Sequence, residues 1–334
     1  MGQNVEFNKE ITVIRDYPGG SNATTSLCMD NDTTFYRKYA NGPDAEKLYQ
    51  QIQWIEENKK VLPLPQILKI EKGRDYCFYD MAYVSHSVGL FEYAHSMPLE
   101  NSQDILKKLL NLLSNTIYTR EKCEANSEII SRYFTEKVDK NLERIRESTV
   151  IKKLIDYDVL IINGEKYNNI KEYKDIISEE FLQEVFCDDK MSVIHGDLTV
   201  ENIICTRDER GDESFYIIDP NTGNILNSPN LDYAKLLQSL HGEYEFIRTA
   251  KDITVHENKI DYSYTHSRVY AELYDWYRKY LLDILSNKMV RSIYIHEIIH
   301  WLRLLPYKLM KEPERAPAYY SKMVIIINDI AKYL

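Results

Sequence analysis

One short motif and the two strand-like segments that follow it constrain the fold of this 334-residue chain more than any other feature. The motif is HGDLTVEN at residues 195–202, and apolar segments follow at residues 203–206 and 214–218. A polar turn with one glycine separates the two segments, which predicts an antiparallel β-hairpin. The ends of a hairpin meet, so Asn202 before the first strand and Asp219 after the second are predicted to lie close together.

Asp197, Asn202 and Asp219 are the residue types that a phosphotransfer site needs. Phosphoryl transfer requires one carboxylate at the acceptor hydroxyl and further oxygen ligands that hold Mg²⁺ against the triphosphate. The step of five residues from Asp197 to Asn202 is that of the kinase catalytic loop, although Gly196 stands where protein kinases have arginine. A surface loop beside a chance hairpin is the alternative interpretation, and three polar residues at matching spacing count against it.

These residues resemble the aminoglycoside phosphotransferase and choline kinase superfamily, whose members share a protein-kinase-like fold. The family pattern is H-G-D-hydrophobic-x-x-x-N, then I-D, then D-hydrophobic-A, and the last element here is Asp-Tyr-Ala at residues 232–234. The resemblance implies that Asp197 is the catalytic base and that Asn202 and Asp219 bind Mg²⁺. It is specific over residues 191–240.

The same resemblance implies that His195 and Asp232 support the catalytic loop. Asp232 has an alternative role as a helix N-cap, because residues 233–240 have a helical pattern. One departure from the family is Pro220, which follows Asp219 where many relatives have an aromatic residue. The departure leaves the expected metal ligand intact and concerns only the local loop.

The N-terminal part has the pattern of β-strands at residues 11–14, 25–29 and 34–39. Gly19 and Gly20 lie between the first two strands, where a kinase small lobe covers the triphosphate with backbone N–H groups. We therefore expect these glycines to contact the nucleotide, although an ordinary hairpin turn gives the same pattern.

A lysine on the third of these strands is the expected phosphate ligand. Lys38 is the candidate because the family uses lysine at this place, and Arg37, its neighbour on the opposite face, is the alternative. Apolar residues at spacings of three and four predict a helix over residues 44–59. Glu46 in its first turn is expected to pair with Lys38, as the family's helix glutamate does, although acidic residues favour helix N-termini in any case.

Two further strands are predicted at residues 66–70 and 76–81. Met81 and Tyr83 then lie where the family joins its two lobes. The resemblance implies that the backbone of this segment binds the edge of the adenine ring.

Strands dominate before residue 84 and helices after it. We therefore predict an α+β, two-lobed protein-kinase-like fold. A small nucleotide-binding lobe, an antiparallel sheet with one main helix, spans residues 1–84, and a larger, mainly helical catalytic and substrate-binding lobe spans residues 85–334. Helices of the larger lobe are predicted at residues 103–120, 129–147, 178–186, 233–240, 266–286 and 291–308, whereas residues 151–175 have no regular pattern.

A second motif competes with the first. Residues 296–300 read HEIIH, the helix signature of zinc peptidases. On a helix His296 and His300 share a face, and Glu297 could polarise a water molecule. No histidine follows His300, and Pro313 interrupts the region that should supply a third ligand, so zinc hydrolysis is the weaker hypothesis.

Composition limits the class of protein. The net charge of −10 at pH 7 argues against nucleic acid as the main partner. The five cysteines are scattered and form no CxxC pair, which is typical of reduced thiols in the cytoplasm. The N-terminus lacks the apolar segment of a signal peptide, and no apolar run reaches the roughly 20 residues of a membrane helix. We expect a soluble, cytoplasmic protein without membrane insertion.

The sequence therefore predicts an enzyme that uses ATP and Mg²⁺ to phosphorylate a hydroxyl group of a small molecule. Only twelve residues separate Asp219 from Asp232 and no A-P-E element follows, so the long activation segment of protein kinases is missing. The acceptor stays open among sugars, choline-type compounds and aminoglycosides, and a cell-surface polysaccharide precursor or a choline-type compound is preferred. A nucleotide-binding scaffold with little turnover is the alternative, against which every expected catalytic side chain is present.

Overall fold

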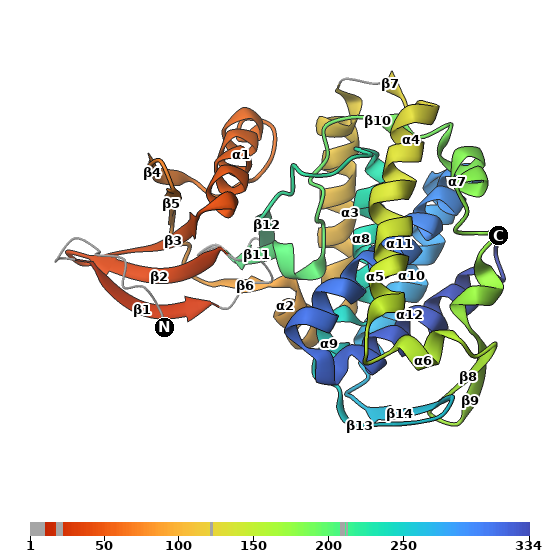
Figure 1. The fold of residues 1–334 in the computed structure, drawn as a ribbon. Coiled ribbons are helices and arrows are strands. Elements are labelled where there is room, and N and C mark those ends of the chain that lie inside the picture. The colour runs from red at the N-terminus through yellow and green to blue at the C-terminus, as the bar shows by residue number, and fades with distance from the viewer. Residues whose placement is uncertain (1–10, 18–22, 121–122, 208–210, 212) are drawn as a thin grey trace. The chain divides into compact units, whose positions relative to one another are not determined.

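The structure is a computed structural model that describes residues 11–17, 23–120, 123–207, 211 and 213–334. The chain divides into two compact units, each described here by itself. Unit 1 comprises Met1–Tyr93 and Asn202–Gly223, and unit 2 comprises Ala94–Glu201 and Asn224–Leu334. The predicted α+β class is confirmed, with an antiparallel sheet near the N-terminus and helices through most of the rest (Figure 1). The predicted functional division at residue 84 stays a prediction.

The main sheet of unit 1 has five antiparallel strands in the order β1-β2-β3-β5-β4. They are β1 (Thr12–Tyr17), β2 (Thr24–Asp30), β3 (Thr33–Asn41), β4 (Ile67–Lys72) and β5 (Tyr76–Ala82). β3 and β5 lie inside the sheet, and side chains such as Phe35, Cys77 and Tyr79 are buried there. All five predicted strands are present.

Helix α1 (Pro43–Asn58) packs against β3 and β5 (Figure 1). Pro43 suits the first turn because its fixed φ is helical and its missing N–H would have no partner there. The buried face carries Leu48, Ile52 and Ile55, at spacings of four and three residues. The helix predicted over residues 44–59 is confirmed.

A second, three-stranded sheet of unit 1 contains the predicted hairpin. Its strands, in the order β12-β11-β6, are β6 (Ser87–Gly89), β11 (Ile203–Arg207) and β12 (Glu213–Ile217). Ile203 lies opposite Ile217, and both side chains are fully buried. The Ile218 N–H donates to the Asn202 carbonyl oxygen at 3.0 Å, so the two ends of the hairpin meet as predicted.

Unit 2 is mainly helical and is built around α11. Its helices are α3 (Leu99–Asn115), α4 (Ser127–Phe134), α5 (Lys140–Glu147), α6 (Lys152–Ile155), α7 (Glu179–Phe186), α8 (Pro229–Leu240), α9 (Tyr244–Ile247), α10 (Arg268–Ile284), α11 (Asn287–Lys311) and α12 (Ala316–Ile330), and α2 (Leu90–Ser96) contains the boundary after Tyr93. Short 3₁₀ turns occur at Ile117–Thr119, Ile170–Tyr173, Val200–Asn202 and Pro313–Arg315. α11 packs against α5, α7, α8 and α12. Every helix predicted for this region is present, whereas α2, α6, α9 and α12 were not predicted.

The helix predicted over residues 129–147 contains a π-helical turn, Thr135–Asp139, between α4 and α5. Such a turn widens the helix by one residue, and the displaced carbonyl groups need other donors. Asn141 supplies one, because its Nδ2 donates to the Lys137 carbonyl oxygen at 2.9 Å. π-Turns occur frequently at functional sites.

Unit 2 also holds two small sheets that the sequence analysis did not predict. Their strands are β7 (Cys123–Glu124) and β10 (Lys190–Met191) in one, and β8 (Val159–Ile162), β9 (Glu165–Asn168), β13 (Lys251–His256) and β14 (Lys259–Ser263) in the other. The four-stranded sheet has the order β13-β14-β8-β9 and packs against α12. β8 with β9 and β13 with β14 form local hairpins, whereas the parallel pairing of β14 with β8 joins segments far apart in sequence.

Two further expectations concern the cysteines and the membrane. All five cysteines lie in the described part of the chain and are free, and Cys28, Cys77 and Cys205 are buried. Within the described residues, the helices are all too short or too polar to cross a bilayer.

Candidate active site

Unit 1 pairs Lys38 of β3 with Asp219, which lies 181 residues further along the chain. The Lys38 ammonium donates to Asp219 Oδ1 at 2.6 Å. The lysine side chain is 7% exposed and the aspartate side chain 37%, so the carboxylate is accessible to a ligand. The sequence marked the two residues separately, as a phosphate ligand and a metal ligand, and the fold brings them together.

Gln51 of α1 is the third member of this group. Lys38 Nζ donates to Gln51 Oε1 at 3.0 Å, and Gln51 Nε2 donates to the Pro220 carbonyl oxygen at 2.8 Å. One amide therefore holds both the ammonium and the backbone of the segment that carries the aspartate. The sequence analysis missed Gln51, although a signal exists. It lies three residues after Leu48 and four before Ile55, on the inward face, where a polar side chain needs a partner.

The expected pair between Glu46 and Lys38 is wrong. Glu46 is exposed, and its carboxylate accepts a hydrogen bond from Lys72 at 2.8 Å. Glu46 precedes Gln51 by five residues, so the two side chains leave α1 about 140° apart. Because Gln51 faces Lys38, Glu46 points away from it.

Arg37, the alternative phosphate ligand, has a different partner. Its Nε and Nη2 donate to the two carboxylate oxygens of Asp80 at 2.6 and 2.7 Å. Both side chains are buried, and the guanidinium lies 4.2 Å from the centre of the Phe78 ring. Arg37 therefore belongs to the interior of the sheet, on the face opposite Lys38.

Asp219 has a left-handed backbone with φ of 59°. Aspartate tolerates this region better than most residues, and the cost, on the order of 1 kcal/mol, is retained where the surroundings fix the conformation. Asn202 lies at the other end of the hairpin. Mg²⁺ prefers oxygen ligands and takes one or two protein groups beside phosphates and water. An accessible carboxylate and an amide at the joined ends of one hairpin fit such an ion in donor chemistry.

The segment expected to bind adenine lies at the end of β5. Met81 is inside the strand, opposite Tyr36 of β3, whereas Tyr83 follows the strand end and is 45% exposed. The contact of their backbone with adenine stays a prediction. Gly19 and Gly20, the predicted phosphate-covering residues, lie outside the described residues.

In unit 2, Asp232 of α8 holds the backbone of the HGD segment. The carboxylate is fully buried. Its Oδ2 accepts from the His195 N–H at 2.8 Å and from the Tyr118 hydroxyl at 2.9 Å, and its Oδ1 accepts from the Gly196 N–H at 2.6 Å. Burial raises the pKa of Asp232 above its ordinary value, against the lowering effect of His195 and these hydrogen bonds.

The alternative role of Asp232 as a helix N-cap is wrong. Ser228 caps α8, because its side chain accepts from the Asn230 N–H and Pro229 begins the helix. Asp232 therefore lies inside the helix and directs its carboxylate to the HGD segment.

The backbone conformation at residue 196 explains why the loop has a glycine there. Its φ is 81°, a left-handed conformation in which an L side chain is strained. Its N–H is bound by Asp232, and its carbonyl oxygen accepts from Asn224 Nδ2 at 3.1 Å. Both peptide groups before Asp197 are thereby fixed.

Asp197 forms an ion pair with Lys235 of α8, with Oδ1 and Nζ 3.0 Å apart. Burial would raise the pKa of Asp197, but Lys235 together with His195 and Arg303 outweighs it and lowers the pKa below its ordinary value. His195 is fully buried, and its Nδ1 accepts from the Asp197 N–H at 3.3 Å. The carboxylate is thus ionised at neutral pH. Lys235 was missed, although it lies one helical turn after Asp232 and therefore on the same face.

The sequence matches no protein-family model and no curated protein. Solved structures do resemble the chain. The aminoglycoside phosphotransferase APH(4)-Ia, in a ternary complex with AMP-PNP and hygromycin B, is 10% identical over 96% of this chain and 95% of that chain, with a TM-score of 0.57. A Haemophilus somnus protein assigned as a fructosamine-3-kinase is 14% identical over 97% and 92%, with a TM-score of 0.54. An ethanolamine kinase from Plasmodium vivax is 14% identical over 98% and 85%, with a TM-score of 0.51.

The chain has the fold of the aminoglycoside phosphotransferase and choline kinase superfamily. The resemblance inferred from the HGD motif and the hairpin is confirmed as a likeness of fold. The sheet with α1 in unit 1 corresponds to the expected small lobe, and the helices of unit 2 correspond to the larger lobe.

The HEIIH segment lies on α11 of this kinase-like fold but does not form a metal site. Its three polar side chains have separate partners, since His296 bonds Asp189, Glu297 bonds His241, and His300 bonds a backbone carbonyl of α8. All three are buried. Within the described residues, His, Cys, Asp and Glu side chains nowhere converge in a group of three that could hold a metal. The zinc hypothesis is therefore wrong.

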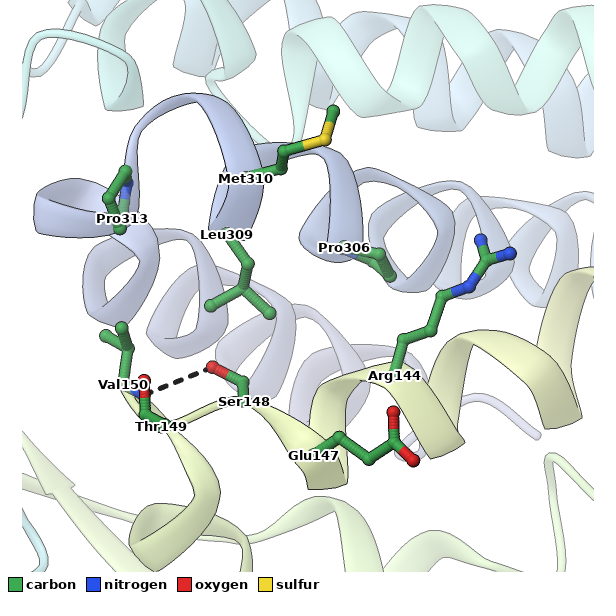
Figure 2. A pocket seen from close by; sticks show the side chains of 9 residues that line it. All are labelled: Arg144, Glu147, Ser148, Thr149, Val150, Pro306, Leu309, Met310 and Pro313. Atoms are coloured by element: carbon green, nitrogen blue, oxygen red, sulfur yellow. Dashed lines mark hydrogen bonds between the residues drawn. The ribbon is translucent and has the colours of Figure 1, made fainter.

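A surface hollow of about 430 Å³ lies between the end of α5 and the second half of α11 (Figure 2). Its lining residues are Arg144, Glu147, Ser148, Thr149, Val150, Pro306, Leu309, Met310 and Pro313. None of them is a predicted site residue, and the lining mixes apolar side chains with charged and hydroxyl side chains. The hollow is therefore separate from the residues described above.

Proposed function

We propose that this protein transfers a phosphoryl group from ATP to a hydroxyl group of a small molecule and requires Mg²⁺. The ion pair between Lys38 and Asp219 carries the proposal. A buried strand lysine and an accessible carboxylate, distant in sequence and joined in one unit, are the groups that bind nucleotide phosphates and their metal ion.

Unit 1 supplies the nucleotide-binding groups of this proposal. Lys38 binds the phosphates, and Gln51 orients its ammonium and the backbone after Asp219. Asp219 and Asn202 would hold Mg²⁺. The bound ion would neutralise the charge of the phosphate oxygens. Tyr83 would contact the adenine edge through its backbone.

Unit 2 supplies the acceptor side. Asp197 would accept a hydrogen bond from the attacking hydroxyl and take its proton. Its lowered pKa keeps the carboxylate ionised, and Asp232 fixes the loop that carries it. The loop that carries Asp197 runs directly into Asn202, so the base and a metal ligand belong to one continuous segment.

A small-molecule acceptor is favoured over a protein for two reasons. The segment from Asp219 to Asp232 is too short to form a protein-kinase activation segment. Structures with the same fold include one with bound hygromycin B and one named as an ethanolamine kinase. The fold alone does not select the acceptor.

Calorimetric titration of ATP with and without Mg²⁺ tests the nucleotide site. We expect Mg²⁺-dependent binding in the wild type and its loss in Asp219→Ala. Asp75→Ala, which removes an exposed aspartate of the same unit, is the matched control and should bind as the wild type does. Equal binding in Asp219→Ala would refute the metal role, and no ATP binding in any protein would refute the function. Asp197→Ala should retain ATP binding and lose transfer once an acceptor is found.

A further inference from the structure

Two basic side chains of unit 2, Lys235 and Arg303, lie near Asp197, and a third, Lys137, lies near Arg303. Lys235 of α8 forms the ion pair described above. Arg303 lies on α11, and Lys137 lies in the π-turn between α4 and α5. Both α8 and the π-turn pack against α11, the helix that carries Arg303.

A series of buried hydrogen bonds orients the Arg303 side chain. Its guanidinium donates to the Tyr133 hydroxyl. Tyr133 lies 3.1 Å from His296 Nδ1, and His296 Nε2 lies 3.2 Å from Asp189 Oδ2. Donors and acceptors match along this series when the Tyr133 hydroxyl donates to His296 Nδ1 and His296 Nε2–H donates to the Asp189 carboxylate. His296 of the HEIIH segment therefore has a role that needs no metal, which is to fix Tyr133 and through it Arg303.

The same guanidinium has unused donor capacity. Within the described residues, its Nη1 is a buried atom without a hydrogen-bond partner. A buried donor without a partner costs about 1–3 kcal/mol, so it needs an explanation such as a ligand or water.

Lys137 is half-buried in the π-turn. Burial, followed by the nearby Arg303 guanidinium, lowers its pKa below the ordinary value. Its acidic neighbour Glu136 raises the pKa of Lys137 in part, but its carboxylate is paired with Lys140. An ammonium placed beside a guanidinium is unfavourable unless an anion compensates the two charges.

Positive charge is therefore in excess near the proposed base. Lys235 and Arg303 lie near Asp197 and Lys137 lies near Arg303, whereas the nearby Glu201 is paired with Arg248 at 2.5 Å. Clusters of uncompensated charge beside a catalytic group are typical of ligand-binding sites rather than of stabilising networks.

We propose that Lys137, Lys235 and Arg303 form an anion-binding subsite beside Asp197, which holds a carboxylate or phosphate group of the acceptor. This inference rests on the phosphotransferase function proposed above. It selects hydroxylated compounds that also carry an acidic group, such as sugar acids or sugar phosphates. Choline-type compounds and aminoglycosides are disfavoured, because a cation requires unpaired carboxylates or open aromatic faces.

Calorimetric titration of inorganic phosphate and, separately, of malonate into the full chain tests the subsite. Lys137→Gln and Arg303→Gln each remove one charge. Lys153→Gln, at an exposed lysine of α6, is the matched control, and Lys38→Gln removes anion binding at the nucleotide site. We expect binding in the wild type, Lys153→Gln and Lys38→Gln, and binding weaker by about tenfold or more in Lys137→Gln and Arg303→Gln. The anion that binds more tightly identifies the acidic group of the acceptor.

The inference fails if neither anion binds at millimolar concentration, if Lys38→Gln alone abolishes binding, or if all the variants bind equally. Lys137→Arg keeps the charge and should keep the affinity, which separates loss of charge from loss of the fold. MgATP is titrated into the same proteins. Normal MgATP binding without an anion site refutes only the subsite, whereas an anion site without MgATP binding refutes the kinase proposal.

Discussion

Substitution of Asp232 tests how the catalytic loop is held. The carboxylate is fully buried and accepts three hydrogen bonds, from the His195 and Gly196 N–H groups and from the Tyr118 hydroxyl. Asp232→Ala removes the acceptor and leaves all three donors in place. Because two of them belong to the backbone directly before Asp197, the loop loses its attachment to α8.

The size of the effect follows from the number of donors. An unpaired buried donor costs about 1–3 kcal/mol, so three of them would cost at least about 3 kcal/mol before relaxation. Entry of water and movement of the loop limit the loss, and we expect Asp232→Ala to lower the free energy of unfolding by about 3–5 kcal/mol. Tyr118→Phe removes one donor and leaves the other two paired, so its expected cost is about 1–2 kcal/mol.

Urea denaturation followed by circular dichroism measures these losses. Hydrogen exchange of peptides that cover residues 195–197 locates them, because protection of the His195 and Gly196 amides should fall in Asp232→Ala. Asp275→Ala removes an exposed aspartate of α10 and should change stability by no more than about 0.5 kcal/mol. If Asp232→Ala is as stable as Asp275→Ala, or if loop exchange is unchanged, the carboxylate does not hold the loop.

Three further predictions concern other parts of the chain. Glu297 and Asp329 overcome the effect of burial on His241 and raise its pKa from 6.5 to about 9. The paired, protonated imidazole therefore stabilises the fold by roughly 3 kcal/mol at most, and this contribution is fully present below about pH 6.5 and is lost as pH rises through about 9. Denaturation at pH 6.5 and 9.5 should show this loss in the wild type but not in His241→Gln, and an equal loss in both would contradict it. Gly196→Ala should cost about 1 kcal/mol in denaturation, because φ is left-handed there, and no change would mean that the loop adjusts freely. Lys38→Gln should weaken MgATP binding by about tenfold or more in calorimetry, and unchanged affinity would remove Lys38 from the site.

Local patterns were sufficient for the elements that make up the fold. The spacing of Leu48, Ile52 and Ile55 predicted α1, and two apolar segments around a glycine turn predicted the β11–β12 hairpin. Hydrogen bonding within a helix or hairpin is local, so its signal lies in neighbouring residues. In the four-stranded sheet, the pairing of Ile260 with Ile162 joins residues about a hundred positions apart and was not predicted. The two local hairpins of this sheet, β8–β9 and β13–β14, were missed as well.

Which side chain of a helix contacts a given partner depends on the face of the helix that packs inward, and the sequence analysis did not use that information for α1. Glu46 and Gln51 both lie on α1, and the family resemblance favoured the acid. The packing of α1 on the sheet turns Gln51 toward Lys38 and leaves Glu46 exposed beside Lys72. The same applies to Asp232, whose role depends on Ser228 beginning α8 one turn earlier.

The sequence by itself determined the residue types of the site, their order and the strands and helices that carry them, because the HGD motif and the hairpin lie within 25 consecutive residues, 195–219. Only the tertiary structure decided which charges meet. The ion pair of Lys38 with Asp219 joins positions 181 residues apart, and the association of Lys137 with Arg303 depends on a π-turn packed against α11. Charge interactions act through space and fall with distance, so they become defined only when folding brings remote segments together.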